Sequence, residues 1–325
     1  MKVQLHQLSG VDCTKFIMAF AVIAIHVQAR TIGGGQQFPF IIQWFISLAV
    51  PFFFITSGYL LGYKLNDNSP QNAPSILLKN RSLQLFRLYG LWLLIYIPIA
   101  VIYYHTQHIN IINAIKNYSL SVIINGESPY SWPLWFIYSM AISCFILSLF
   151  KPPKKNLIIA FCIFFIVTLF NSCDYNNIIL KAIKVITHRS LAGGVFIVAG
   201  MLLQSYKIRL GFIGGGNLLL ISALMKYFDI PIADLVGGIG VFAFALSVPL
   251  KPSKIYVQLR QLSMWIYYTH MLILFPCVII GNSNGQYFNL YFLLVISSLI
   301  VMLLSLALNT LQTKPHFKWL QTMIK

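Results

Sequence analysis

The chain has 325 residues, of which 58% are hydrophobic and 9% are charged, and its mean hydropathy is +0.78. A soluble domain carries about 25% charged residues because its surface faces water, so this composition excludes an ordinary soluble protein. The net charge of +17 is spread over short segments between apolar runs. Because these segments form no basic helix and no aromatic RNA-binding pattern, no nucleic-acid partner is expected.

Ten apolar runs follow one another along the chain. A helix that crosses the hydrocarbon core of a bilayer needs about 20 predominantly apolar residues. The sequence therefore predicts an all-α, polytopic transmembrane helix bundle with spans at 11–29, 41–63, 83–104, 132–150, 156–172, 190–205, 210–226, 233–250, 261–280 and 289–312.

The basic residues predict the orientation of this bundle. With the N-terminus in the cytoplasm, 16 of the 23 Lys and Arg residues fall in cytoplasmic segments and 6 fall in outer segments. This distribution predicts that both ends of the chain are cytoplasmic. No Pro/Ser-rich linker or clear internal repeat divides the sequence, and no soluble appendage is expected. Residues 1–325 are therefore predicted to form one membrane domain.

Two predicted outer segments, residues 105–131 and 173–189, are long enough to have a function. The first carries Glu127, and the second carries His188 and Arg189. A polar acceptor could be held by such side chains, although loops that only cap the bundle explain them equally well.

The first span contains two ionisable residues that need a reason to be there. Such a side chain costs about 2.5–3.5 kcal/mol inside a membrane helix. Lys15 and His26 lie eleven residues apart, which is about 16 Å along a helix and close to three turns. Asp12 can pair with Lys15 at helical spacing. Either Lys15 reaches the cytoplasmic interface beside Asp12 while His26 bonds inside the bundle, or both residues belong to a site.

Further segments place polar or small residues in and around the apolar spans. Residues 50–61 read VPFFFITSGYLL, so Pro, Ser and Gly lie within the second span; a packing kink would explain them as well. Residues 131–138 (SWPLWFIY) open the fourth span, and residues 263–270 (SMWIYYTH) put a second histidine in the ninth. An interfacial aromatic belt explains the tryptophans equally well.

Taken in chain order, these segments resemble the acyltransferase-3 family of integral membrane acyltransferases. The family signature in the first helix is a basic residue, ten intervening residues and a histidine, which Lys15 and His26 match. The run PFFFITSGYLL is the most specific similarity, and residues 134–136 (LWF) and 266–270 (IYYTH) also resemble family patterns. The family more often has Arg at the basic position, and Lys keeps the charge without the bidentate geometry.

The resemblance implies a membrane enzyme that moves an acyl group, by default acetyl, from cytoplasmic acyl-CoA to a hydroxyl of an extracytoplasmic carbohydrate or other envelope acceptor. It implies His26 as general base, and direct transfer and an acyl-histidine intermediate both stay open. CoA phosphates are expected near Lys15, Arg81 and Arg87. The expected location is a bacterial inner membrane. Further candidate substrate contacts are Ser57, Tyr59, Glu127, Trp135, Tyr138 and His270.

No permanent cofactor and no metal site is expected. His105 and His108 are three residues apart, but no third ligand stands nearby except Glu127. The glycine runs Gly33–Gly35 and Gly214–Gly216 lack the context of a phosphate loop, and the second run is expected to break the seventh span.

The main alternative to an acyltransferase is a small-molecule permease or exporter built on the same membrane fold. Broken spans and ionisable residues near the midplane are typical of transporters. The sequence shows no inverted repeat, which favours the enzyme.

Overall fold

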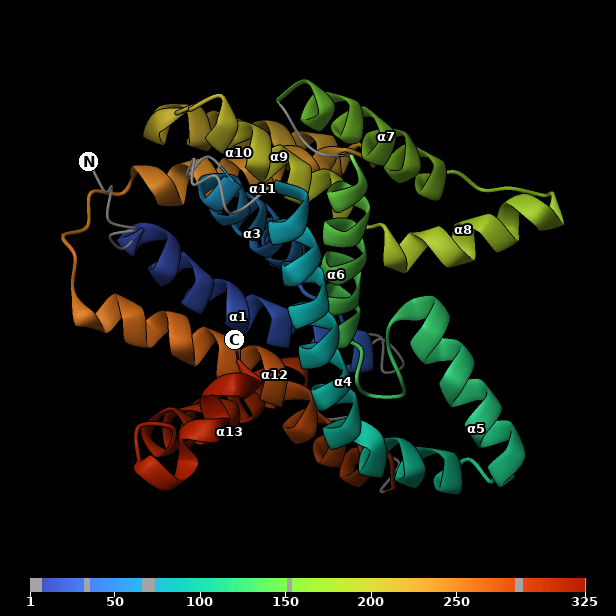
Figure 1. The fold of residues 1–325 in the computed structure, drawn as a ribbon. Helices are drawn as coiled ribbons and strands as arrows, with labels where there is room; N and C mark the ends of the chain where they lie inside the picture. The colour runs from blue at the N-terminus through green and yellow to red at the C-terminus, as the bar shows by residue number, and fades with distance from the viewer. Residues whose placement is uncertain (1–7, 32–35, 66–73, 151–153, 284–288, 325) are drawn as a thin grey trace. The chain divides into compact units, whose positions relative to one another are not determined.

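The computed structural model describes residues 8–31, 36–65, 74–150, 154–283 and 289–324, and throughout these ranges every regular element is a helix (Figure 1). The all-α prediction is therefore confirmed. The elements in chain order are α1 (Ser9–Thr31), α2 (Phe40–Ser47), α3 (Ala49–Leu65), α4 (Pro74–Thr106), α5 (Ile111–Leu120), the π-helical turn η2 (Ser121–Asn125), α6 (Leu134–Leu149), α7 (Lys154–Ser172), α8 (Ile178–Ser190), α9 (Gly194–Ser205), α10 (Gly211–Tyr227), α11 (Ala233–Ser247), α12 (Lys254–Ser283), α13 (Leu290–Leu311) and the 3₁₀ segment η3 (Pro315–Met323).

The described residues divide into two compact units. The first unit takes the described parts of Met1–Val50, Leu210–Leu224 and Gly240–Lys325, and the second takes those of Pro51–Arg209 and Met225–Ile239. The chain passes between the units within α3, just before α10, and again within α10 and α11. The expectation of one membrane domain stays a prediction.

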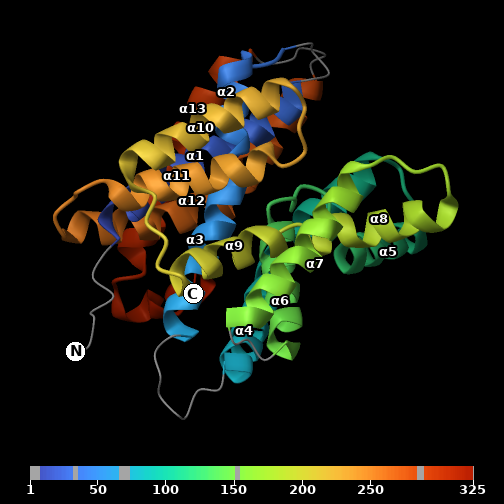
Figure 2. The same ribbon diagram turned by 90° about the horizontal axis from the view of Figure 1, so that it is seen from above.

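In the first unit, α1 packs against both α12 and α13, and Figures 1 and 2 show α1 and α12 side by side. Glycines allow close helix approach in this unit. A Cβ at Gly10 would overlap the carbonyl oxygen of Ala245 on α11. The expected break at Gly214–Gly216 is wrong, because α10 continues through these residues and Gly215 lies against Gly240 of α11.

The side chains of α13 are arranged as in a helix between lipid and protein. Its buried face carries Ser297, Val301 and Ser305, one turn apart, while Leu299 and Leu303 are exposed, the latter to 67%. Small and weakly polar residues toward the protein, with large apolar residues outside, are typical of helices packed within a membrane. The arrangement would be inverted in a water-soluble bundle.

In the second unit, α4 packs along α6, and α7 packs against α9. The hydroxyl of Ser82 donates to the carbonyl oxygen of Ala141 at 2.8 Å, which joins α4 to α6 inside the protein. A Cβ at Gly58 of α3 would overlap the backbone of Ile197 on α9. The contact between α3 and α9 is thus one of backbone against backbone.

Each of the ten predicted spans coincides with at least one helix, but not all helices have the length of a full crossing. Among the described residues, four helices or helix pairs are long and apolar enough to cross a membrane: Ser9–Ala29, Phe40–Leu65, Pro74–Thr106 and Leu290–Leu311. A fifth is added if Ile178–Ser190 and Gly194–Ser205, bent by 47°, count as one span. The protein is therefore a helical membrane protein, and the count of ten and the orientation stay predictions.

Both segments that the sequence predicts to be outer loops contain helices. Asn110 and Asn177 start α5 and α8, because each side chain accepts a hydrogen bond from a backbone N–H of the first turn. Both helices are amphipathic: α8 carries Lys181, Lys184 and His188 on one side and Ile179, Ile183 and Ile186 on the other. These helices, and not irregular loops, present the polar side chains of the two segments.

Candidate active site

A buried carboxylate links α1 to α12 near the beginning of both helices. The Oδ1 atom of Asp12 lies 3.6 Å from Nζ of Lys15, and its Oδ2 atom lies 3.5 Å from Nη1 of Arg260. Asp12 is 2% exposed and stands in the first turn of α1, where the helix dipole favours a negative charge. The predicted pair between Asp12 and Lys15 is present. Two cations against one carboxylate leave this cluster with one net positive charge.

Arg260 is a member of this cluster that the sequence does not indicate. In the sequence it is one of the predicted cytoplasmic positive charges, and nothing there shows that α12 lies beside α1. The guanidinium group binds phosphate in a bidentate fork, which the Lys15 ammonium group cannot do. Arg260 thus adds a guanidinium group to the cluster that contains the Lys15 ammonium group.

His26 and His270 meet further along the same two helices. Their ring centroids are 5.2 Å apart, with an angle of 31° between the ring planes. His270 is fully buried, and its Nδ1 atom lies 3.2 Å from the carbonyl oxygen of Ile266. Its Nε2 atom has no hydrogen-bond partner among the described residues. The two histidines that the sequence singled out separately are neighbours.

The cation cluster and the histidine pair form two layers of one helix pair. From Lys15 to His26 is eleven residues, about 16 Å of rise, and from Arg260 to His270 is ten residues, about 15 Å. The earlier residues of both helices meet in the cation cluster and the later residues meet in the histidine pair, so α1 and α12 run parallel. This geometry places a cationic end and an imidazole end on one helix pair of the first unit.

The other predicted donor-binding residues belong to the second unit. Arg81 of α4 donates through Nη1 to Oε1 of Gln84 at 2.8 Å, and Arg87 is exposed. Their part in binding CoA stays a prediction. Ser57 and Tyr59 flank Gly58 at the contact of α3 with α9, and a Cβ at Gly200 would overlap the backbone of Ile55. The small residues of the PFFFITSGYLL run therefore serve helix packing.

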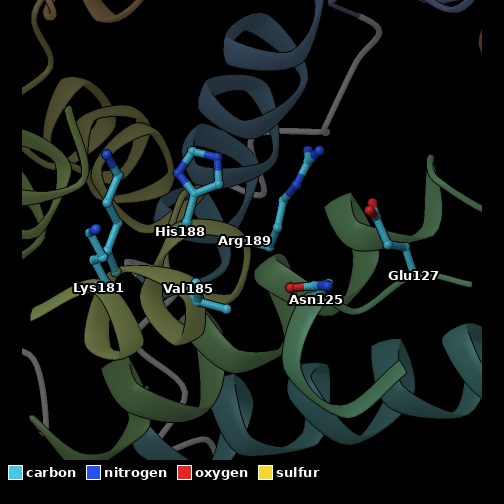
Figure 3. A pocket seen from close by; sticks show the side chains of 7 residues that line it. Asn125, Glu127, Lys181, Val185, His188 and Arg189 are labelled. Carbon is cyan, nitrogen blue, oxygen red and sulfur yellow. The ribbon is translucent and has the colours of Figure 1, made fainter. Parts of the chain in front are cut away.

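Of the weaker candidates, Glu127 lines a cavity of about 440 Å³ in the second unit, while Trp135 and Tyr138 contact residues beside it. Figure 3 shows Lys181 and His188 on one side, Asn125 and Glu127 on the other, and Arg189 between them. Trp135 of α6 supports Arg189, whose Cζ atom lies 4.9 Å from the Trp135 ring centroid. The hydroxyl of Tyr138 donates to the carbonyl oxygen of Ile123 in η2. Lys184 and Val185 complete the lining.

Glu127 is the acidic residue of this cavity. Burial raises the pKa of its carboxyl group, and the positive charge of Arg189 opposes that shift. Its Oε2 atom is buried and has no hydrogen-bond partner among the described residues. A buried acceptor of this kind suits a hydroxyl or ammonium group of a ligand, since an unpaired buried carboxylate oxygen is costly.

The remaining motifs do not form a further site in the part of the chain that the structure describes. His105 and His108 are exposed near the end of α4, and the described His, Cys, Asp and Glu side chains form no group of three that could hold a metal ion. Gly33–Gly35 lies outside the described residues.

Fold and site together define a helical membrane protein in which one helix pair carries a cation cluster and, about three turns further along, two neighbouring histidines. The chain belongs to the acyltransferase-3 family, whose model, described as an acyltransferase domain, matches residues 8–308. It is also similar to an amino-acid racemase of Enterococcus faecalis, with 29% identity over 178 residues, or 54% of this chain and 23% of that protein. The matched part of this chain thus spans about a quarter of the racemase's length. No solved structure matches the chain significantly.

Proposed function

We propose that the protein is an O-acyltransferase of the bacterial inner membrane that moves an acyl group, by default acetyl, from cytoplasmic acyl-CoA to a hydroxyl group of an envelope glycan outside. The observation that carries the proposal is the pair of layers on α1 and α12. One layer has cations for a phosphate-bearing donor, and the other has paired imidazoles for proton transfer. Because the chain belongs to an acyltransferase family, acyl transfer is the reaction that we assign to this arrangement.

The donor end would be the cation cluster. Lys15 and Arg260 carry charges suited to the phosphates of CoA, with Arg81 and Arg87 as further predicted contacts. The distance of about 16 Å between the layers is comparable to an extended pantetheine arm. A thioester at the end of that arm would reach the histidine layer.

The reacting end would be His26. As a neutral imidazole it would take the proton of the acceptor hydroxyl while the hydroxyl oxygen attacks the thioester carbonyl. The C–S bond then breaks, the acyl group forms an ester, and the CoA sulfur leaves as a thiolate that regains the proton. In a two-step variant, His26 attacks first and carries the acyl group before the acceptor arrives. His270, in contact with His26, would orient that imidazole.

The orientation needed for this reaction is the predicted one, with ten spans and both ends of the chain cytoplasmic. It puts Lys15 near the cytoplasmic end of α1 and His26 in its outer half. It also puts α5, η2 and α8 outside, where Glu127, Trp135 and Tyr138 are candidates for contact with the acceptor.

The test is transfer of label from radiolabelled acetyl-CoA to a mixed envelope-glycan fraction by membranes that contain wild type or His26→Ala. The proposal expects label in the glycan with wild type and none with a variant that elutes normally in detergent size exclusion. Equal labelling by both proteins would remove His26 from the centre of the reaction and direct attention to His270.

A permease is the second candidate, and the bent helix pair α8–α9 favours it, because broken spans are typical of transporters. The similarity to an amino-acid racemase makes an amino acid the solute to test first. Proteoliposomes distinguish the two functions. Uptake of an amino acid without acyl-CoA, unaffected by His26→Ala, would support the permease, whereas acyl-CoA-dependent labelling supports the enzyme.

A further inference from the structure

The cavity between α8 and η2 has a charge that fits a doubly charged anion. Three of its lining residues, Lys181, Lys184 and Arg189, are cationic, and Glu127 is the acidic residue of the lining. With His188 neutral, the lining carries a net charge of +2. Lys184 also forms an ion pair of 3.2 Å with Asp174, but the Asp174 side chain is fully exposed, so this pair does little to neutralise the positive charge of the cavity.

Two helices contact η2, namely α8, which lines the cavity, and α5, and both have the composition of membrane-surface helices. Exposed apolar residues cover one side of α8, including Ile179, Ile183 and Ile186, and the same is true of Ile111 and Ile112 on α5. Amphipathic helices with lysines on the polar face lie in the headgroup region of a bilayer. Since η2 contacts both helices, a cavity beside it would open at that depth.

Headgroup depth decides which anion the cavity meets. Lysine and arginine side chains there attract the phosphates of amphiphiles whose chains stay in the bilayer. A phosphate monoester is doubly charged near neutral pH and accepts several hydrogen bonds at once. Lys181 and Arg189 can donate such hydrogen bonds to its oxygen atoms. Glu127, on the other side of Arg189, offers its unpaired Oε2 atom to a hydroxyl donor.

We propose that the α8–η2 cavity binds the phosphate of a membrane-borne amphiphile, held between Lys181, Lys184 and Arg189, with Glu127 accepting a hydrogen bond from a hydroxyl of the same molecule. The role of this amphiphile rests on the proposed function: if the protein is an acyltransferase, the amphiphile is the acyl acceptor. The acceptor would then be a lipid-linked phosphate, delivered from the bilayer and not from water.

The test measures binding of tritiated dodecyl phosphate to full-length protein in octyl glucoside micelles, by scintillation proximity and without acyl-CoA. Lys181→Glu should weaken binding at least tenfold, about the effect of losing one charge-assisted hydrogen bond. Lys116→Glu is the matched control, because it makes the same charge change on α5 but does not line the cavity. Its affinity should equal that of wild type. Size exclusion checks that both variants fold.

Competition identifies the source of the phosphate. Dodecanol and inorganic phosphate, each at the concentration of the probe, should displace little label. Displacement by dodecanol would mean micelle partition, and displacement by inorganic phosphate would mean a site for the free ion. Either result, or equal affinity of wild type and Lys181→Glu, overturns the proposal. Because binding needs no chemistry, binding without acyl transfer contradicts only the proposed function, and transfer without binding contradicts only this site.

Discussion

The carboxylate of Asp12 lies between Lys15 and Arg260 and is almost fully buried. Removing one member of a buried ion cluster leaves the others without compensation, which costs about 3–5 kcal/mol in well-buried cases. Asp12→Asn should therefore lower the unfolding temperature in detergent by several degrees. The matched control is Asp174→Asn, which removes an exposed pair and should change little. Equal changes in unfolding temperature for the two variants would show that the buried Asp12 cluster does not stabilise the fold more than an exposed ion pair does.

Glu127 provides a prediction that depends on pH. Its carboxyl pKa is raised in the folded protein, so the folded state binds the proton more tightly than the unfolded chain does. The group's ionisation therefore costs stability as pH rises from the unfolded pKa, about 4.3, through the folded value. Glu127→Gln should be more stable than wild type at about pH 7.5, and the difference should vanish at about pH 3.5. Thermal unfolding at both pH values measures this, and a less stable variant at neutral pH contradicts it.

At the scale of elements, the contact of α3 with α9 depends on glycine. Gly58→Ala puts a methyl group into the backbone of Ile197, a collision that no side-chain rotation relieves. We expect a loss of about 1–3 kcal/mol, the usual cost of overpacking, seen as a lower unfolding temperature. Gly90→Ala on α4 is the control, since nothing lies within 4 Å of its added Cβ. That variant should equal or exceed wild type in stability, because Ala favours a helix over Gly. A stable Gly58→Ala would refute the close crossing.

The sequence predicts a helix well where a long apolar run marks it, and poorly where a short, partly polar segment forms it. The spans at 11–29 and 289–312 differ from α1 and α13 by a few residues. α5 and α8 were missed as helices because they are short and partly polar, although Asn110 and Asn177 could have indicated their N-termini. Contacts between residues far apart in the chain could not be predicted either, because no local sequence pattern links His26 to His270 or Asp12 to Arg260.

At the scale of the whole molecule, orientation is the property that the basic residues predict and that a fusion experiment measures. Alkaline phosphatase, which is active only outside the cytoplasm, should be active when fused after Gln107 or Asn176. It should be inactive when fused after Lys207 or Lys251, which lie on the predicted cytoplasmic side. Activity at Lys207 combined with inactivity at Asn176 would reverse the orientation of that part of the chain.

The central claim is that α1 and α12 hold the donor at one end and perform the chemistry at the other, and the steady-state kinetics of transfer from acetyl-CoA test it most directly. His26→Ala should lower kcat by about 10²–10⁴-fold with nearly unchanged acetyl-CoA binding. Arg260→Ala should instead raise the KM for acetyl-CoA while leaving kcat within a few-fold of wild type. A His26 variant that changes only KM, or an Arg260 variant that changes only kcat, would contradict the assignment of the two layers.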